Sequence, residues 1–313
     1  MPSLRGGSFR LFRLAGVDVF LHWSWFLIAA IEVQSRQGTY SSVVWNVLEY
    51  LALFLIVLTH EFGHAMACRS VGGRADRIVL WPLGGVAYVN PPQRAGAMLW
   101  SIAAGPLVNV ALVPIFFGAM MLASSMGWPE TMPNVYKLLD SVAWINGALL
   151  IFNLLPIYPL DGGQILRSVL WFMMGRARSL MVATVIGLLG AAALIVYALY
   201  DQSVWTFAIC AFIVMNCWSG LQQARKLLQF AKLPRREGFQ CPSCKTGPPL
   251  GPYWGCGHCQ QSFDTFATGG VCPNCGVQYA TTTCLDCGEQ RPISEWTVGA
   301  DPRVAVVSSS FSG

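Results

Sequence analysis

The sequence predicts an all-α polytopic membrane protein with about six transmembrane helices and a short β-hairpin insertion, followed by a small cytoplasmic region. Hydrophobic residues make up 54% of the 313 residues and charged residues only 11%, whereas about 25% of an ordinary soluble domain is charged. Apolar stretches long enough to cross a bilayer recur up to about residue 221. Beyond residue 240 the chain is polar and holds eight of the eleven cysteines, in four C-x-x-C pairs typical of zinc ribbons.

These observations divide the chain into three parts. Residues 1–230 are expected to form the membrane domain. Residues 231–296 hold two zinc ribbons, at about 241–259 and 272–287. Residues 297–313 are expected to be a disordered tail.

The first expected span covers residues 17–31 and follows three arginines, Arg5, Arg10 and Arg13. A basic segment before an apolar stretch is also the pattern of a secretory signal peptide. No small-residue cleavage site follows, so we interpret the stretch as an uncleaved transmembrane helix that keeps the amino terminus in the cytoplasm. His22 lies within it and is interpreted as a packed or capping residue rather than a metal ligand.

The second span covers about residues 44–68 and carries His60-Glu61-Phe62-Gly63-His64 towards its end. On an α-helix, residues i and i+4 point the same way, so His60 and His64 can hold one zinc ion. Glu61 lies roughly 100° round the helix and can accept a proton from water on that metal. The alternative is a polar cluster at a helix end in the water interface. Ionisable groups inside a membrane helix are costly, however, and are rarely placed there without a function.

Residues 78–89 predict two short strands joined at residues 82–85, directly after this helix. Such a hairpin could receive an extended peptide at its free edge, or it could be a plain connection. The residue pattern alone leaves both alternatives open.

Later spans are expected at residues 96–123, 142–155, 180–199 and 204–221. The second of these ends in a segment, from Asn153 to Gly163, that places two prolines, two glycines and Asp161 at membrane depth. Irregular backbone survives there only where it is buried in protein or lines a wet cavity, so Asp161 is expected to face something polar. The prolines end regular helix and the glycines permit a sharp redirection, which can aim this carboxylate at the histidines.

The distribution of basic residues predicts the orientation. Between alternating spans, ten Lys and Arg residues fall on one side and two on the other. The ten are Arg5, Arg10, Arg13, Arg69, Arg74, Arg77, Arg94, Arg167, Arg176 and Arg178, and the two are Arg36 and Lys137. Because basic residues favour the cytoplasmic side, we expect both termini in the cytoplasm, with the chain in a bacterial cytoplasmic membrane. His60, His64 and Asp161 then approach that side at one depth.

The sequence resembles the site-2 protease family of intramembrane zinc metalloproteases over roughly residues 10–225. The resemblance rests on two separated motifs in the family's order, His60 to His64 and Asn153 to Gly163. Two shorter motifs add to it, namely Gly84-Gly85-Val86 and Gly105-Pro106-Leu107-Val108-Asn109. The cysteine pairs of the tail depart from the familiar members.

This resemblance implies a catalytic zinc ion bound by His60, His64 and Asp161. It also implies that Glu61 activates water and that Asn153 helps to stabilise the oxyanion. Two histidines and one carboxylate would leave the fourth tetrahedral position of the zinc open for water, which agrees with the implied chemistry.

The resemblance further implies that the substrate is a transmembrane segment of another protein. Helical peptide bonds are shielded by their own hydrogen bonds, so local unwinding must come first. The family pattern places Gly84, Gly85 and Val86 near the active site, where they could hold the unwound segment as an added strand.

The four cysteine pairs predict two structural zinc ions, each bound by four thiolates. We expect a first ribbon from Cys241, Cys244, Cys256 and Cys259, and a second from Cys272, Cys275, Cys284 and Cys287. A cross-braced arrangement would use the same residues. Disulfides are the competing interpretation, which a reducing cytoplasm disfavours. His258 is expected to be exposed, because both four-cysteine sets are complete without it.

The charge of the tail bears on its partner. Residues 231–313 hold six Lys and Arg against six Asp and Glu, so they lack the basic footprint of a nucleic-acid-binding domain. A protein-contact or regulatory module is therefore favoured.

Taken together, these features predict a zinc metalloendopeptidase that hydrolyses peptide bonds within or near transmembrane segments, in regulated intramembrane proteolysis. One alternative is a catalytically silent membrane scaffold that recruits partners through its zinc ribbons, and another is a metal transporter. Glu61 favours the enzyme, because a scaffold has no use for a general base. The concentration of ionisable groups in one cluster disfavours an ion path across the membrane.

Overall fold

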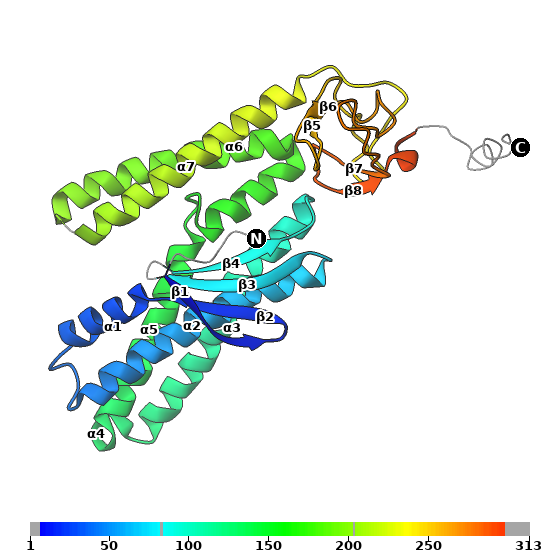
Figure 1. The fold of residues 1–313 in the computed structure, drawn as a ribbon. Helices are drawn as coiled ribbons and strands as arrows, with labels where there is room; N and C mark the ends of the chain where they lie inside the picture. Colours follow the sequence, from blue (N-terminus) through cyan, green and yellow to red (C-terminus); the bar gives the residue numbers. More distant parts are fainter. Residues whose placement is uncertain (1–6, 82–83, 203, 298–313) are drawn as a thin grey trace, which may run out of the picture. The chain divides into compact units, whose positions relative to one another are not determined.

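The computed structural model of the chain describes residues 7–81, 84–202 and 204–297 (Figure 1). Three expectations fall partly outside these residues: the basic Arg5, the centre of the hairpin turn at 82–83, and the disordered tail from residue 298 onward.

The chain divides into two compact units. The larger unit contains residues 1–91 and 95–224, and the smaller contains residues 92–94 and 225–313. The larger unit holds the long helices and a four-stranded sheet, and the smaller unit holds the eight clustered cysteines.

The expectation of a membrane helix over residues 17–31 is wrong in its secondary structure. The stretch begins as strand β2 (Val17–His22), which pairs antiparallel with β1 (Ser8–Leu14), and only its remainder enters a helix, α1 (Ser24–Ser35). Three of the six side chains of β2 are buried, in strict alternation, which is the two-residue period of a strand. The overall apolarity of the stretch concealed this alternation in the sequence.

β2 and α1 together nonetheless run along most of the length of α2 (Val43–Ser70), in the opposite direction. At one end the Arg69 guanidinium donates to the carbonyl of Gly16, 3.0 Å away, and at the other end Arg36 pairs with Glu49 at 2.7 Å. A strand followed by a short helix therefore lies beside α2 in place of the expected single helix.

The expected hairpin is confirmed and belongs to a larger sheet. β3 (Arg74–Trp81) and β4 (Gly84–Asn90) pair antiparallel, while β2 and β3 pair in parallel, which gives the strand order β1-β2-β3-β4. Ile78 and Leu80 of β3 are fully buried and share a core with β2 and α2. This packing holds β4 at the edge of the sheet.

Within the described residues, five helices are long and apolar enough to cross a membrane, and the expected count of about six spans stays a prediction. They are α2, α3 (Ala95–Ser125), α5 (Pro133–Leu154), α6 (Asp161–Asp201) and α7 (Val204–Ala231), with the short α4 (Trp128–Thr131) between α3 and α5.

α6 consists of two helices divided at Gly175, whose φ of 81° interrupts the helical backbone. Its first part was not among the expected spans. Its second part and α7 run side by side (Figure 1) and bury Ala191, Ile213 and Cys217 between them. Ile157 and Tyr158, which precede Asp161, pack against this pair.

The smaller unit is built from two short hairpins around an aromatic core. One hairpin joins β5 (Trp254–Gly255) to β6 (Ser262–Phe263), and the other joins β7 (Thr281–Thr283) to β8 (Gln290–Pro292), followed by a 3-10 helix, η1 (Ile293–Trp296). Trp254, Phe266 and Trp296 are buried together with cysteines of the unit. A core this small gains stability from cross-links such as disulfides or bound metal ions.

Candidate metal centres

The histidine motif lies in the buried part of α2. His60, Glu61 and His64 are only 4%, 6% and 6% exposed. α3 approaches this turn closely at Gly105, where a Cβ atom would lie 2.3 Å from His64 Nε2 and 2.8 Å from His60 Nε2. A residue with a side chain at position 105 would therefore collide with both imidazoles, which explains the glycine.

Asp161 completes a compact triangle of donor atoms. As the first residue of α6, it places Oδ2 3.0 Å from His60 Nε2 and 3.3 Å from His64 Nε2, and the two nitrogens are 3.1 Å apart. Tetrahedral zinc with ligands at about 2.0–2.1 Å separates neighbouring donor atoms by about 3.3 Å. The three predicted ligands thus lie together at spacings that suit one zinc ion.

The outer nitrogens of both rings show which atoms face this triangle. His64 Nδ1 lies 2.9 Å from the backbone carbonyl of Ser101, which can only accept, so His64 Nδ1 carries the hydrogen. His60 Nδ1 lies 2.5 Å from Asn109 Oδ1. In the neutral rings both Nε2 atoms then carry lone pairs that face each other and the Asp161 carboxylate. Three such donor atoms so close together can bind one cation, and the donor set fits zinc.

Glu61 lies between the metal triangle and the sheet. Its Oε2 atom accepts a hydrogen bond of 2.8 Å from the backbone N–H of Ala87 in β4. A Cβ at Gly85 would lie 2.3 Å from Glu61 Cγ, so the β4 backbone rests directly on the glutamate. Of the hairpin residues expected near the site, Gly85 is in contact with Glu61, while the side chain of Val86 is 48% exposed.

The predicted oxyanion residue, Asn153, lies near the end of α5 and is partly exposed. Its role remains a prediction. The structure instead brings two other asparagines to the metal triangle: Asn109 of α3, which contacts His60, and Asn146 of α5, which contacts Asn109. Asn109 entered the sequence argument only as part of a motif, and Asn146 did not enter it. Asn146 could have been found in the sequence as a lone amide in an apolar helix, seven residues and therefore two turns before Asn153.

Two family models match the part of the chain that carries these residues. Residues 27–157 match a model described as Peptidase M50B-like, and residues 128–197 match Peptidase family M50. The two matches overlap and together extend from residue 27 to residue 197. The chain belongs to peptidase family M50, the site-2 protease family.

Individual relatives agree with this family. The M50 chain is 29% identical over 222 residues to a zinc metalloprotease of Methanocaldococcus jannaschii, over 71% of this chain and 62% of that protein. It is 38% identical over 120 residues to stage IV sporulation protein FB of Bacillus subtilis, over 37% of this chain and 38% of that protein. The chain thus spans less than two thirds of the length of these curated relatives.

A solved structure is also similar to part of the chain. It is a site-2 protease from Methanocaldococcus jannaschii, with 25% sequence identity and a TM-score of 0.49. The match covers 68% of the M50 chain and 95% of the solved one.

The tail of this M50 chain brings its eight cysteines together in an order that differs from the expected one. One group contains Cys241, Cys244, Cys284 and Cys287, and the other contains Cys256, Cys259, Cys272 and Cys275. The expected grouping of neighbouring pairs is wrong, and the alternative cross-braced order is not formed either. The first and last pairs enclose the two middle pairs.

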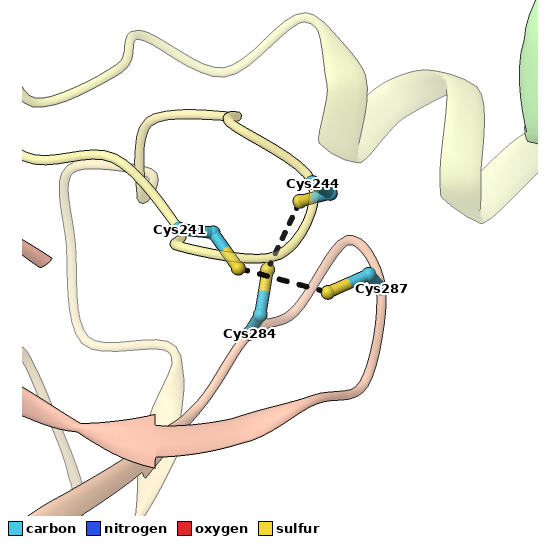
Figure 2. Close-up of side chains that lie close together, drawn as sticks. All are labelled: Cys241, Cys244, Cys284 and Cys287. Atoms are coloured by element: carbon cyan, nitrogen blue, oxygen red, sulfur yellow. Dashed lines mark hydrogen bonds between the residues drawn. The ribbon is translucent and has the colours of Figure 1, made fainter. Parts of the chain in front are cut away.

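The outer group faces inward from two loops (Figure 2), with Sγ–Sγ distances of 3.7 Å for Cys241–Cys287 and for Cys244–Cys284. The inner group has distances of 3.5 Å for Cys256–Cys275 and 3.6 Å for Cys259–Cys272. Disulfide sulfurs lie about 2.05 Å apart, whereas tetrahedral zinc with Zn–S bonds of about 2.3 Å separates its sulfurs by about 3.8 Å. The distances suit two zinc ions, and His258 is exposed as expected.

All four C-x-x-C pairs adopt the same turn. In each, the residue after the second cysteine has a positive φ and donates its N–H to the carbonyl of the first cysteine; these residues are Lys245, Gln260, Gly276 and Gly288. The N–H of each first cysteine donates in turn to a carbonyl five residues later. The local sequence therefore builds four equivalent C-x-x-C turns, each presenting two thiols and called a hook below. Only the tertiary fold determines which hooks come together.

Hydrogen bonding favours the ionised thiol at Cys256 of the inner group. The Tyr279 hydroxyl accepts from the N–H of Gly257 at 2.8 Å and lies 3.1 Å from Cys256 Sγ. This hydroxyl is the largest cause that lowers the pKa of Cys256 below the ordinary thiol value. A thiolate is the form that binds zinc.

Double substitutions distinguish the observed grouping, in which the first and last cysteine pairs share one site, from the expected grouping of neighbouring pairs. We predict that Cys241→Ser combined with Cys287→Ser removes one zinc ion per chain, because both residues belong to the outer group. Cys241→Ser combined with Cys256→Ser should remove two, because it damages both groups. The measurement is the zinc content of the purified full-length chain. The grouping of neighbouring pairs would give the reverse result, two ions lost in the first variant and one in the second.

Proposed function

We propose that the chain is an intramembrane zinc metalloendopeptidase that hydrolyses peptide bonds within or near transmembrane segments of other proteins. The observation that carries this proposal is the triangle of His60 Nε2, His64 Nε2 and Asp161 Oδ2, with sides of 3.0–3.3 Å, beside the buried carboxylate of Glu61. Membership of peptidase family M50 and the names of the relatives support it.

In the proposed mechanism His60, His64 and Asp161 hold the zinc ion. Bound zinc would polarise the scissile carbonyl and lower the pKa of a bound water to about 7. Glu61 accepts the proton of the attacking water and delivers it to the leaving amine. The Ala87 N–H donates a hydrogen bond to Glu61 Oε2 and so orients the carboxylate. Asn153 is proposed to stabilise the oxyanion.

The substrate is proposed to bind along β4. The Ala87 N–H points away from β3, because it reaches Glu61. Along a strand, backbone groups alternate in direction, so the polar groups of Gly85 share the side of Ala87. An unwound substrate segment could pair by strand addition with the backbone groups of Gly85 on this side, while Ala87 keeps its bond to Glu61, and its peptide bonds would then lie next to Glu61.

The orientation is proposed to place both termini in the cytoplasm. The strand and short helix from Val17 to Ser35 run along α2 and are proposed to make a sixth crossing in addition to the five long helices. The excess of basic residues on one side, ten against two, supports the same assignment. The cysteine-rich unit then lies in the cytoplasm, where we propose that it contacts a protein partner or regulates access.

Glu61→Gln tests the general base. An amide cannot accept the proton of water, so cleavage of a single-span substrate in liposomes should fall by about 10²–10⁴-fold, while the zinc content stays at the wild-type level. The matched control is Glu49→Gln, which alters the other buried glutamate of α2, twelve residues earlier, and should leave cleavage near wild type. Equal cleavage by Glu61→Gln and wild type would contradict the assignment.

Photocrosslinking tests the β4 docking site. A benzoylphenylalanine placed at Val86 in the inactive Glu61→Gln chain should crosslink to substrate residues around the scissile bond. The control position is Ile115 of α3, which is 62% exposed against 48% for Val86 and lies on a different element. Crosslinks from position 115 but not from position 86 would show that the substrate binds elsewhere.

A further inference from the structure

Two buried asparagines form a hydrogen-bonded chain that ends on a metal ligand. Asn109 of α3 is 0% exposed and Asn146 of α5 is 1% exposed. Neither residue supplies one of the three atoms of the metal triangle. A side-chain amide is nevertheless costly to bury in a membrane helix and is rarely placed there without a function.

The chain of bonds fixes the orientation of every group in it. Asn146 Nδ2 donates to the backbone carbonyl of Asn109 at 3.1 Å, and because a carbonyl only accepts, the other amide atom of Asn146 must be oxygen. That oxygen accepts from Asn109 Nδ2 at 2.8 Å. Asn109 Oδ1 is then the atom left to face His60 Nδ1, 2.5 Å away, and it accepts the ring hydrogen.

This orientation decides how His60 meets a metal ion. A hydrogen on Nδ1 leaves the lone pair on Nε2, which lies in the triangle with His64 and Asp161. If Asn109 turned over, its Nδ2 would face His60 and favour the opposite tautomer, with a hydrogen on Nε2 where a metal ion must bind. The two amides are fully enclosed, so bulk water does not compete for these bonds.

The second histidine ligand does not depend on such a chain. His64 Nδ1 donates directly to the backbone carbonyl of Ser101, whose orientation α3 itself fixes. His60 is therefore the ligand whose tautomer depends on side chains, and the outermost of these belongs to a different helix, α5.

We infer that Asn146 is a positioning residue: it orients Asn109, which holds His60 in the tautomer that can bind zinc. The inference rests on the proposed function, since it assigns a role around the same metal site. It also gives α5 a part in the site through Asn146, separate from any role of Asn153.

The tautomer itself is measurable, because the chain contains only four histidines. The full-length chain is labelled with ¹⁵N at histidine, placed in lipid nanodiscs and stripped of zinc with a chelator, and His60→Gln assigns the His60 signals. Wild type should show hydrogen on Nδ1 of His60. Asn146→Leu should show a mixture of both tautomers at His60, while His64 keeps its single form and proves that the unit is folded. A single Nδ1–H tautomer at His60 in Asn146→Leu would overturn the inference.

Zinc retention provides a second readout that does not depend on activity. The zinc of this site is the amount that wild type holds in excess of His60→Gln. In Asn146→Leu, half of it should be released at a chelator concentration about 10–100-fold lower than in wild type. Thr184→Val is the matched control: it removes a fully buried hydroxyl that bonds to carbonyls of its own helix, and should change nothing.

The two ideas fail in different ways. If wild type holds no zinc beyond that of His60→Gln, the proposed function fails and the inference fails with it. If wild type holds this zinc and Asn146→Leu holds it equally firmly, only the role of Asn146 is overturned.

Discussion

Two imidazole nitrogens and a carboxylate oxygen lie within 3.3 Å of one another among largely buried residues of the larger unit. Polar groups so close together and so little exposed must be held in place by the surrounding structure. α2 supplies both histidines one turn apart. α3 approaches them at Gly105 and accepts their outer N–H groups, directly through Ser101 and through the side chain of Asn109. The first residue of α6, Asp161, delivers the carboxylate from a distant part of the sequence.

The sheet serves the same centre from the other side. β2 and β3 bury their apolar side chains against α2, which fixes β4 at the edge and rests its backbone on Glu61. One carboxylate thus faces both the metal triangle and the strand proposed to receive the substrate. The proposed general base and the proposed docking strand are therefore in direct contact, through the Ala87–Glu61 hydrogen bond and the close approach at Gly85.

Much of the site could be predicted from the sequence, because its geometry is local. Helical spacing predicts that His60 and His64 share a face, and the turn residues around Asp161 predict an irregular segment at membrane depth. The features that escaped prediction depend on contacts between distant segments. The alternation in Val17–His22 indicates a strand only once β3 is known to lie beside it. The role of Asn146 depends on a helix packing that no spacing reveals.

The cysteines illustrate the same division. The turn of each C-x-x-C pair is local and occurs four times with the same hydrogen bonds. The grouping is not local, because any two of the four hooks supply the four thiolates that zinc requires. The β7–β8 hairpin and the aromatic core around Trp296 place the last hook against the first. The outer group consequently ties together the two ends of the cysteine-rich unit.

The most direct test of the central claim is anomalous diffraction at the zinc absorption edge from crystals of the full-length chain. The account predicts a peak about 2.0–2.2 Å from His60 Nε2, His64 Nε2 and Asp161 Oδ2, in addition to one peak within each four-cysteine group. The cysteine sites serve as the internal control for zinc occupancy. Peaks at both cysteine groups with none among His60, His64 and Asp161 would contradict the account.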